Sequence, residues 1–87
     1  MYFAYVLRSL SCNRLYVGST SQLQVRVSQH NEGISSPTKH WRPWELVHSE
    51  EFKTRAEAMR RERFWKTGRG REELKLLLAR RAHQTQR

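Results

Sequence analysis

The sequence contains no aspartate, so all eight of its acidic side chains are glutamates. A hard divalent ion such as Mg²⁺ binds chiefly to oxygen ligands, and the charged ligands of such a site must therefore be glutamates here. The single cysteine, Cys12, excludes an internal disulfide and a metal site built from several thiolates. This cysteine content is typical of a reduced intracellular protein, and we expect the chain to be cytoplasmic.

Long apolar runs are also missing. No stretch approaches the roughly 18 apolar residues that cross a bilayer, and the N-terminus lacks the basic and then apolar pattern of a signal peptide. We therefore expect no membrane partner. A chain of 87 residues has room for one small core. We expect a single domain over residues 1–82, followed by a frayed tail over residues 83–87.

Positive charge is what the sequence has in excess. Seventeen Lys and Arg residues against eight glutamates give a formal net charge of +9 and a pI of about 10.9. The resulting field attracts polyanions, of which nucleic acid is the commonest. The alternative is that the charge only keeps a small domain in solution. Charge alone leaves both interpretations open, and the motifs must decide between them.

Apolar residues with strand periodicity predict three β-strands. The first two, over residues 2–7 and 15–19, flank a short turn and are expected to pair as an antiparallel hairpin. The third, over residues 44–52, alternates between apolar and polar side chains. Residues 33–43 combine glycine, proline, serine and basic side chains without apolar periodicity, which predicts an exposed loop.

Two capping boxes, at residues 21–24 and 54–57, predict where helices begin. The first helix is expected to end at Gly33 and the second near residue 67, where glycines interrupt the pattern. A last helix is expected over residues 71–81, with leucines on one face. The order strand, strand, helix, strand, helix, helix predicts an α/β (α+β) domain in which three helices flank a three-stranded antiparallel sheet.

Polar side chains lie on the faces of two helices that should pack on this sheet. Arg26 and His30 share the apolar stripe of the first helix, and Glu62 lies on the apolar stripe of the second. A buried carboxylate is costly unless another group compensates its charge. Glu62 and Arg26 could therefore form a structural salt bridge, or both could belong to a functional site.

Two tyrosines on the strands favour the functional interpretation. Tyr5 and Tyr16 can face the same side of an antiparallel pair, although Tyr5 could equally be an ordinary core aromatic. Phenols, a guanidinium, an imidazole and a carboxylate together suit phosphodiester hydrolysis. A carboxylate holds a divalent ion, an arginine offsets charge on phosphorus, and a tyrosine or histidine accepts a proton from water. The few inward carboxylates favour one metal ion over two.

The order and spacing of these residues resemble those of the GIY-YIG endonuclease superfamily, in particular its small single-domain members. The resemblance extends from residue 2 to about residue 78. It implies metal-dependent cleavage of DNA with Mg²⁺ or Mn²⁺, without an organic cofactor, in DNA repair or recombination. The form of the DNA, whether single-stranded, branched or duplex, and the oligomeric state stay open.

Three residues on the strands match the two motifs that define this superfamily. Tyr5 matches the tyrosine of the first motif, which reads Phe3-Ala4-Tyr5 here and lacks the usual glycine. Tyr16 and Gly18 match the second motif, which reads YVG. A glycine at position 18 lets a phosphate or a neighbouring part of the chain approach closely.

Three residues on the helices match the remaining functional positions. The resemblance implies that Arg26 contacts the scissile phosphate, that His30 assists proton transfer, and that Glu62 binds the single metal ion. We expect Tyr16 to be the general base or to position water, His30 to relay its proton, and Tyr5 to support them through a hydrogen bond. Which tyrosine acts as the base stays open.

Two groups of basic residues are candidates for DNA binding. In the expected loop, Trp41 lies among cations and would either stack on an unpaired base or pack on the sheet. The second group surrounds the end of the second helix and could equally be a solvated face. The candidates are Lys39, His40, Trp41 and Arg42 in the loop, and Arg60, Arg61, Lys66, Arg69 and Arg71 in the second group.

The sequence therefore predicts a metal-dependent DNA endonuclease that uses one metal ion. Because one small domain leaves no room for a separate recognition module, we expect weak sequence preference. Affinity should come largely from contacts with the DNA backbone and should fall steeply with salt. The alternative is a non-catalytic nucleic-acid-binding module that retains the fold.

Overall fold

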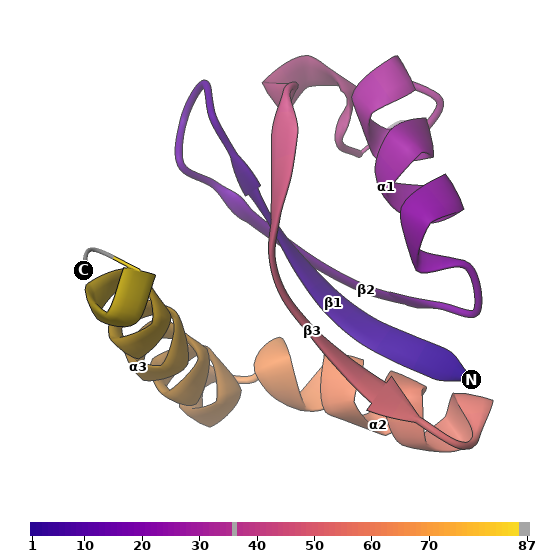
Figure 1. Cartoon of the computed structure of the whole chain (residues 1–87), viewed down its shortest axis with the longest axis vertical. Helices are drawn as coiled ribbons and strands as arrows, with labels where there is room; N and C mark the ends of the chain where they lie inside the picture. The colour runs from indigo at the N-terminus through magenta and orange to yellow at the C-terminus, as the bar shows by residue number, and fades with distance from the viewer. Residues whose placement is uncertain (36, 86–87) are drawn as a thin grey trace.

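A computed structural model describes residues 1–35 and 37–85, with side chains described up to residue 80. The order of strands and helices is ββαβαα, as expected, with a short 3-10 helix before the third strand (Figure 1). Residues 86 and 87 of the expected tail lie outside the described residues, so the frayed tail stays a prediction. The elements are β1 (Tyr2–Ser9), β2 (Leu15–Thr20), α1 (Leu23–Glu32), η1 (Lys39–Trp41), β3 (Trp44–Phe52), α2 (Arg55–Trp65) and α3 (Gly68–Thr85).

The three strands form one antiparallel sheet in the order β2-β1-β3. The central strand β1 pairs with β2 so that Tyr5 faces Gly18 and Leu7 faces Tyr16. Both faces of a central strand are covered, which is why residues 4–7 form an unbroken buried run. Strand β2 is an edge strand, and side chains from both faces of the sheet can meet around it.

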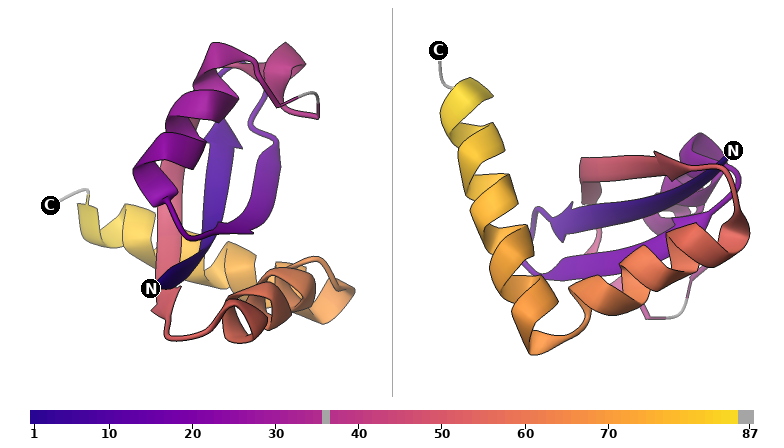
Figure 2. Two further views of the ribbon diagram at one scale, coloured as in Figure 1. Left: turned by 90° about the vertical axis from the view of Figure 1, so that its right-hand side faces the viewer. Right: turned by 90° about the horizontal axis from the view of Figure 1, so that it is seen from below.

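Helices cover both faces of the sheet, with α1 on one side and α2 and α3 on the other (Figures 1 and 2). Successive β1 side chains point to opposite faces. Val6 packs against Trp65 on the α2 side, whereas Tyr5 and Leu7 pack with Trp44 on the α1 side. In the part of the chain that the structure describes, none of the helices is long and apolar enough to span a membrane.

The two expected capping boxes have different outcomes. The box at residues 54–57 is confirmed, because the Thr54 side chain accepts from the backbone N–H of Glu57 and the Glu57 carboxylate accepts from that of Thr54. The box at residues 21–24 is wrong. Helix α1 begins after Gln22, which is its N-cap and makes no side-chain cap. The hydroxyl of Thr20 accepts from the Gln22 backbone N–H at 3.0 Å.

The glycines after α2 form a sharp corner, and α3 begins at Gly68, three residues earlier than expected. The Thr67 hydroxyl accepts from the Gly70 backbone N–H at 3.0 Å and so caps the new helix. A Cβ on Gly70 would overlap the backbone carbonyl of Phe64. The glycine therefore lets α3 begin in direct contact with the end of α2.

The segment between α1 and β3 is not simply the exposed loop that its composition predicts. Gly33 ends α1 with φ of +82°, as expected, but Ser35 and Thr38 are buried. The Trp44 indole N–H donates to the Thr38 carbonyl oxygen at 2.8 Å, and the Asn31 side chain accepts from the Trp44 backbone N–H. These hydrogen bonds fix the segment against the end of α1, next to the face of the sheet that carries Tyr5.

Candidate active site

A buried hydrogen bond joins the first expected tyrosine to the helix histidine. The Tyr5 hydroxyl lies 2.9 Å from His30 Nε2, and the side chains of both residues are almost completely buried. Tyr5 reaches across from the central strand, and His30 comes from the last turn of α1. The structure therefore brings together two predicted residues that are 25 positions apart.

A residue that the sequence interpretation missed fixes the direction of this hydrogen bond. The Thr38 hydroxyl donates to the Ser35 carbonyl oxygen at 3.2 Å, so its lone pair accepts from His30 Nδ1 at 2.8 Å. With its proton on Nδ1, the neutral imidazole accepts at Nε2 from the Tyr5 hydroxyl. Thr38 belongs to no periodic pattern. Only its position eight residues after His30 could have indicated its role.

Burial keeps both members of this pair uncharged at neutral pH. It raises the pKa of Tyr5 to about 12, with a further increase from Tyr16 and an opposing effect from Arg26. Burial also lowers the pKa of His30 to about 4, and the positive charge of Arg26 acts in the same direction. Tyr5 is thus a hydrogen-bond donor and His30 its acceptor.

Tyr16 differs from Tyr5 in its access to solvent. Its ring is half-buried, with its centroid 4.8 Å from that of His30 and 6.4 Å from that of Tyr5. Among the described residues, its hydroxyl has no hydrogen-bond partner. Of these two tyrosines, Tyr16 is therefore the one whose hydroxyl is available to a water molecule or a substrate.

The glycine of the second motif lies directly beneath Tyr5. A Cβ on Gly18 would lie 2.6 Å from the Tyr5 hydroxyl oxygen and 2.7 Å from Cζ. These distances are too short for non-bonded atoms, so any side chain at position 18 must displace the ring. The part of the chain that approaches Gly18 is thus the ring of Tyr5.

Arg26 lies half-buried on α1, one turn before His30. It donates from Nη1 to Oε1 of Gln29 at 3.0 Å, and its charge acts on the pKa of both Tyr5 and His30. Among the described residues, no ion pair joins Arg26 to Glu62. The expected pairing of these two residues is therefore wrong, and Glu62 forms its ion pair with Lys66 instead.

Glu62 lies on the α2 side of the sheet. Its Oε1 accepts from the Ser19 hydroxyl at 2.7 Å, and its Oε2 pairs with Lys66 Nζ at 2.7 Å. Ser19 and Tyr16 point to opposite faces of β2, so the glutamate and the tyrosine lie on opposite faces of one edge strand. The charge of Glu62 nevertheless acts across the sheet, because it makes a minor contribution to the raised pKa of Tyr5.

Glu62 offers one carboxylate to a hard cation. Its side chain is 20% exposed, and no three His, Cys or Glu side chains cluster as a metal site in the part of the chain that the structure describes. Mg²⁺ commonly binds through one or two carboxylates and completes its shell with water and phosphate oxygens. Glu62 could provide the protein ligand, provided that Lys66 releases Oε2.

The loop candidates for DNA binding lie on and beside η1. Lys39, His40 and Arg42 are exposed, while Trp41 is half-buried and packs against the cluster that contains Tyr5. The guanidinium of Arg14 lies 4.7 Å from the centroid of the Trp41 ring. Trp41 thus packs on the sheet as one alternative expected, while part of its surface stays accessible.

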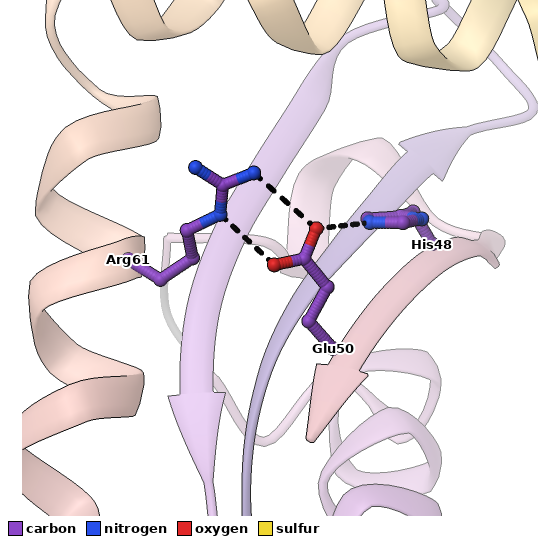
Figure 3. A network of polar contacts seen from close by, with 3 residues as sticks. All are labelled: His48, Glu50 and Arg61. Carbon is purple, nitrogen blue, oxygen red and sulfur yellow. Dashed lines mark hydrogen bonds and ion pairs between the residues drawn. The ribbon is translucent and has the colours of Figure 1, made fainter. Parts of the chain in front are cut away.

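The second group of basic candidates is more varied. Arg61 donates to Glu50 at 2.9 Å, and the same carboxylate lies 2.8 Å from His48 Nε2 (Figure 3). Burial acts to raise the pKa of Glu50, but its hydrogen bonds to Arg61 and His48 outweigh this and lower it. Lys66 is paired with Glu62. The remaining members, Arg60, Arg69 and Arg71, are exposed.

Comparison with known proteins gives a consistent result. Residues 1–75 match the model of the GIY-YIG catalytic domain. A UPF0213 protein of Staphylococcus haemolyticus is 36% identical over 77 residues, which cover 87% of this chain and 93% of the relative. A UPF0213 protein of Bacillus velezensis is 45% identical over 62 residues, which cover 70% of this chain and 62% of the relative.

A solved structure shows the same fold. The solution NMR structure of a UPF0213 protein from Bacillus halodurans is similar to this chain with a TM-score of 0.53 and 30% sequence identity. The similarity covers 88% of this chain and 85% of that chain. The fold of this chain thus occurs in a solved structure.

Proposed function

The chain belongs to the GIY-YIG family of nuclease domains, and from this premise we propose that it is a divalent-metal-dependent endonuclease. It hydrolyses phosphodiester bonds in DNA and uses one metal ion. The observation that carries the proposal is the arrangement around β2, where Tyr16 and Arg26 lie on one face and Glu62 on the other.

Each residue has a role that its environment supports. Tyr16, whose hydroxyl has no hydrogen-bond partner in the described part of the chain, positions the attacking water or accepts its proton. Arg26 binds the scissile phosphate and offsets the negative charge that develops on it. Tyr5, His30 and Thr38 form the buried hydrogen-bonded series that holds the ring of Tyr5 behind Tyr16. The expected relay of a proton from Tyr16 through His30 stays a prediction. The two ring nitrogens of His30 are hydrogen-bonded to Tyr5 and Thr38.

Glu62 would hold the cation, with Ser19 fixing the orientation of its carboxylate. When bound, Mg²⁺ or Mn²⁺ supplies Lewis-acid stabilisation of charge on the phosphate and on the leaving oxygen. Glu62 is the ligand that this chain would provide, and a single carboxylate favours one ion. Lys66, once released from Glu62, is placed to contact a phosphate.

One observation favours the alternative of a DNA-binding module without catalysis. The carboxylate that should bind metal is already paired with Lys66 at 2.7 Å. In a non-catalytic module, this pair would stay closed and the basic surface would only hold DNA. The two functions differ in whether the glutamate is needed for cleavage.

Nicking of supercoiled plasmid DNA, with Mg²⁺ or with a chelator, tests the proposal. We expect the wild-type protein to nick only with metal, and Glu62→Gln to lose at least about 100-fold in rate while it still binds DNA. Glu72→Gln, which removes an exposed carboxylate on α3, is the matched control and should cleave like the wild type. If wild type and Glu62→Gln both bind DNA and neither nicks it, the binding module is correct.

A further inference from the structure

A cavity of about 520 Å³ lies along the edge strand β2, next to the candidate active site. Tyr16 forms part of its wall, so the cavity and the candidate active site share this residue. Its volume lies in the range of pockets that bind small organic groups. The cavity, which we call the β2 groove, is lined by Arg14, Leu15, Tyr16, Val17, Pro37, Thr38, Trp41, Trp44, Trp65, Lys66, Arg71 and Leu74.

All three tryptophans of the chain line the β2 groove. Trp44 and Trp65 are buried and belong to the two halves of the core, on opposite faces of the sheet. Trp41 is half-buried, and together with Tyr16 it offers accessible aromatic surface. Flat aromatic side chains bind nucleobases by stacking, with little dependence on which base is present.

The charged side chains that line the β2 groove, among the described residues, are all basic. Arg14, Lys66 and Arg71 are exposed, and of these Lys66 is paired with Glu62. Arg14 already stacks on Trp41, which places a cation directly beside the aromatic surface. A purely apolar ligand would make no ionic contact with these cations. A nucleotide can stack its base on the aromatic rings and contact the cations through its phosphates.

We propose that the β2 groove binds one unpaired nucleotide of the DNA, with its base against Trp41 and Tyr16. The phosphates on either side of that base contact Arg14 and the cations at the α2–α3 corner. This inference rests on the proposed function and adds to it. Tyr16 belongs to both the candidate active site and the β2 groove. The preferred substrate is therefore DNA with an unpaired base next to the scissile phosphate.

Fluorescence of 2-aminopurine in a short single-stranded oligonucleotide tests this pocket. With the full chain and a chelator present, we expect binding to quench the probe, since stacking on aromatic rings quenches it. Trp41→Ala should weaken binding to the single strand about tenfold, and Trp41→Phe, which keeps an aromatic ring, should weaken it much less. Binding to a blunt duplex of the same sequence should change little in either variant.

Two arginine variants keep the test decisive if Trp41→Ala fails to fold. Arg14→Ala removes a charge at the β2 groove, and Arg63→Ala removes the same charge from an exposed position on α2 that does not line it. We expect Arg14→Ala to weaken single-strand binding several-fold more than Arg63→Ala. Equal losses of single-strand affinity in the two variants, or an unquenched probe in the wild-type complex, would overturn the proposal that the β2 groove binds a nucleotide.

The outcomes separate this inference from the nuclease proposal because binding is measured without metal. Metal-dependent nicking together with an unquenched probe would reject nucleotide binding in the β2 groove but support the nuclease proposal. Quenching that depends on Trp41 and Arg14, without any nicking, would support nucleotide binding in the β2 groove and reject the nuclease proposal. Tighter binding of an oligoglutamate peptide than of the oligonucleotide, with the same dependence on Arg14, would show a protein ligand and overturn the inference.

Discussion

Tyr5 and Gly18 face each other on β1 and β2, and the position of the tyrosine ring depends on the absence of a side chain opposite it. The sequence predicts that Gly18 permits a close approach. It does not identify what approaches, because the register of the two strands follows from the complete hairpin. In the structure, the ring of Tyr5 fills this space on its way to His30.

We predict that Gly18→Ala destabilises the fold by about 2 kcal/mol, because the new methyl group overlaps the Tyr5 ring. Urea unfolding measures the change. A double-mutant cycle with Tyr5→Leu identifies the cause, since the shorter side chain should relieve most of the cost of the alanine. Equal costs of Gly18→Ala in the two backgrounds would show that the overlap with Tyr5 is not responsible.

Arg26, His30 and Glu62 could be found from the sequence because polar residues at apolar positions of a helix are conspicuous. Their partners could not be found in the same way. Ser19, which orients the Glu62 carboxylate, lies 43 positions away on β2. Thr38 lies in a segment without periodicity, where no pattern distinguishes a buried hydroxyl from an exposed one.

Helices α2 and α3 meet at a corner that depends on one glycine. Composition alone suggests that Gly68 and Gly70 interrupt a helix, whereas the structure includes both in α3. They differ in their surroundings. A Cβ on Gly68 would meet no other atom within 4 Å, while one on Gly70 would overlap the backbone of Phe64 and Trp65.

We predict that Gly70→Ala lowers the free energy of unfolding by about 3 kcal/mol, since α3 must move away from α2 and loosen the contact of Leu74 with Trp65. Gly68→Ala is the matched control and should be neutral or stabilising by up to about 1 kcal/mol. Thermal unfolding followed by circular dichroism measures both. A similar stability of the two variants would contradict this account of the corner.

The periodicity of apolar residues predicted which segments are strands and which are helices. Capping residues and glycines predicted where most of these elements begin and end. At Thr54 the helix begins where the sequence pattern places it, and the capping box forms. At residues 21–24 the helix begins one residue later than the box requires, with Gln22 as its N-cap, so Ser21 and Gln24 do not take the two positions of a capping box. Where a helix begins after a strand depends on where the strand stops, which the local sequence does not specify.

For the molecule as a whole, burial of a neutral histidine links stability to pH. The folded chain holds His30 with a pKa of about 4, whereas in the unfolded chain the value returns to 6.5. Below pH 6.5 the unfolded state therefore binds more protons than the folded state, and stability falls as the pH falls towards 4. The lowered pKa of Glu50 adds a further loss at the acid end of this range.

We predict a loss on the order of 3 kcal/mol between pH 7 and pH 4 from His30 alone. Urea unfolding across this range measures it, and His40→Gln, which alters an exposed histidine, is the control that should leave the slope unchanged. NMR titration should show that His30 keeps its neutral form down to about pH 5. A His30 resonance that titrates near pH 6.5 in the folded protein would contradict the prediction.

The proposed mechanism requires that groups from the two faces of the sheet act on one phosphate across β2. Single-turnover cleavage of labelled DNA by Tyr16→Phe and Glu62→Gln, measured side by side with the control Tyr2→Phe, tests this directly. We predict that both variants lose at least about 100-fold in rate while they bind DNA and unfold like the wild type, and that the control cleaves normally. If either Tyr16→Phe or Glu62→Gln cleaves at the wild-type rate, the two faces do not form one active site.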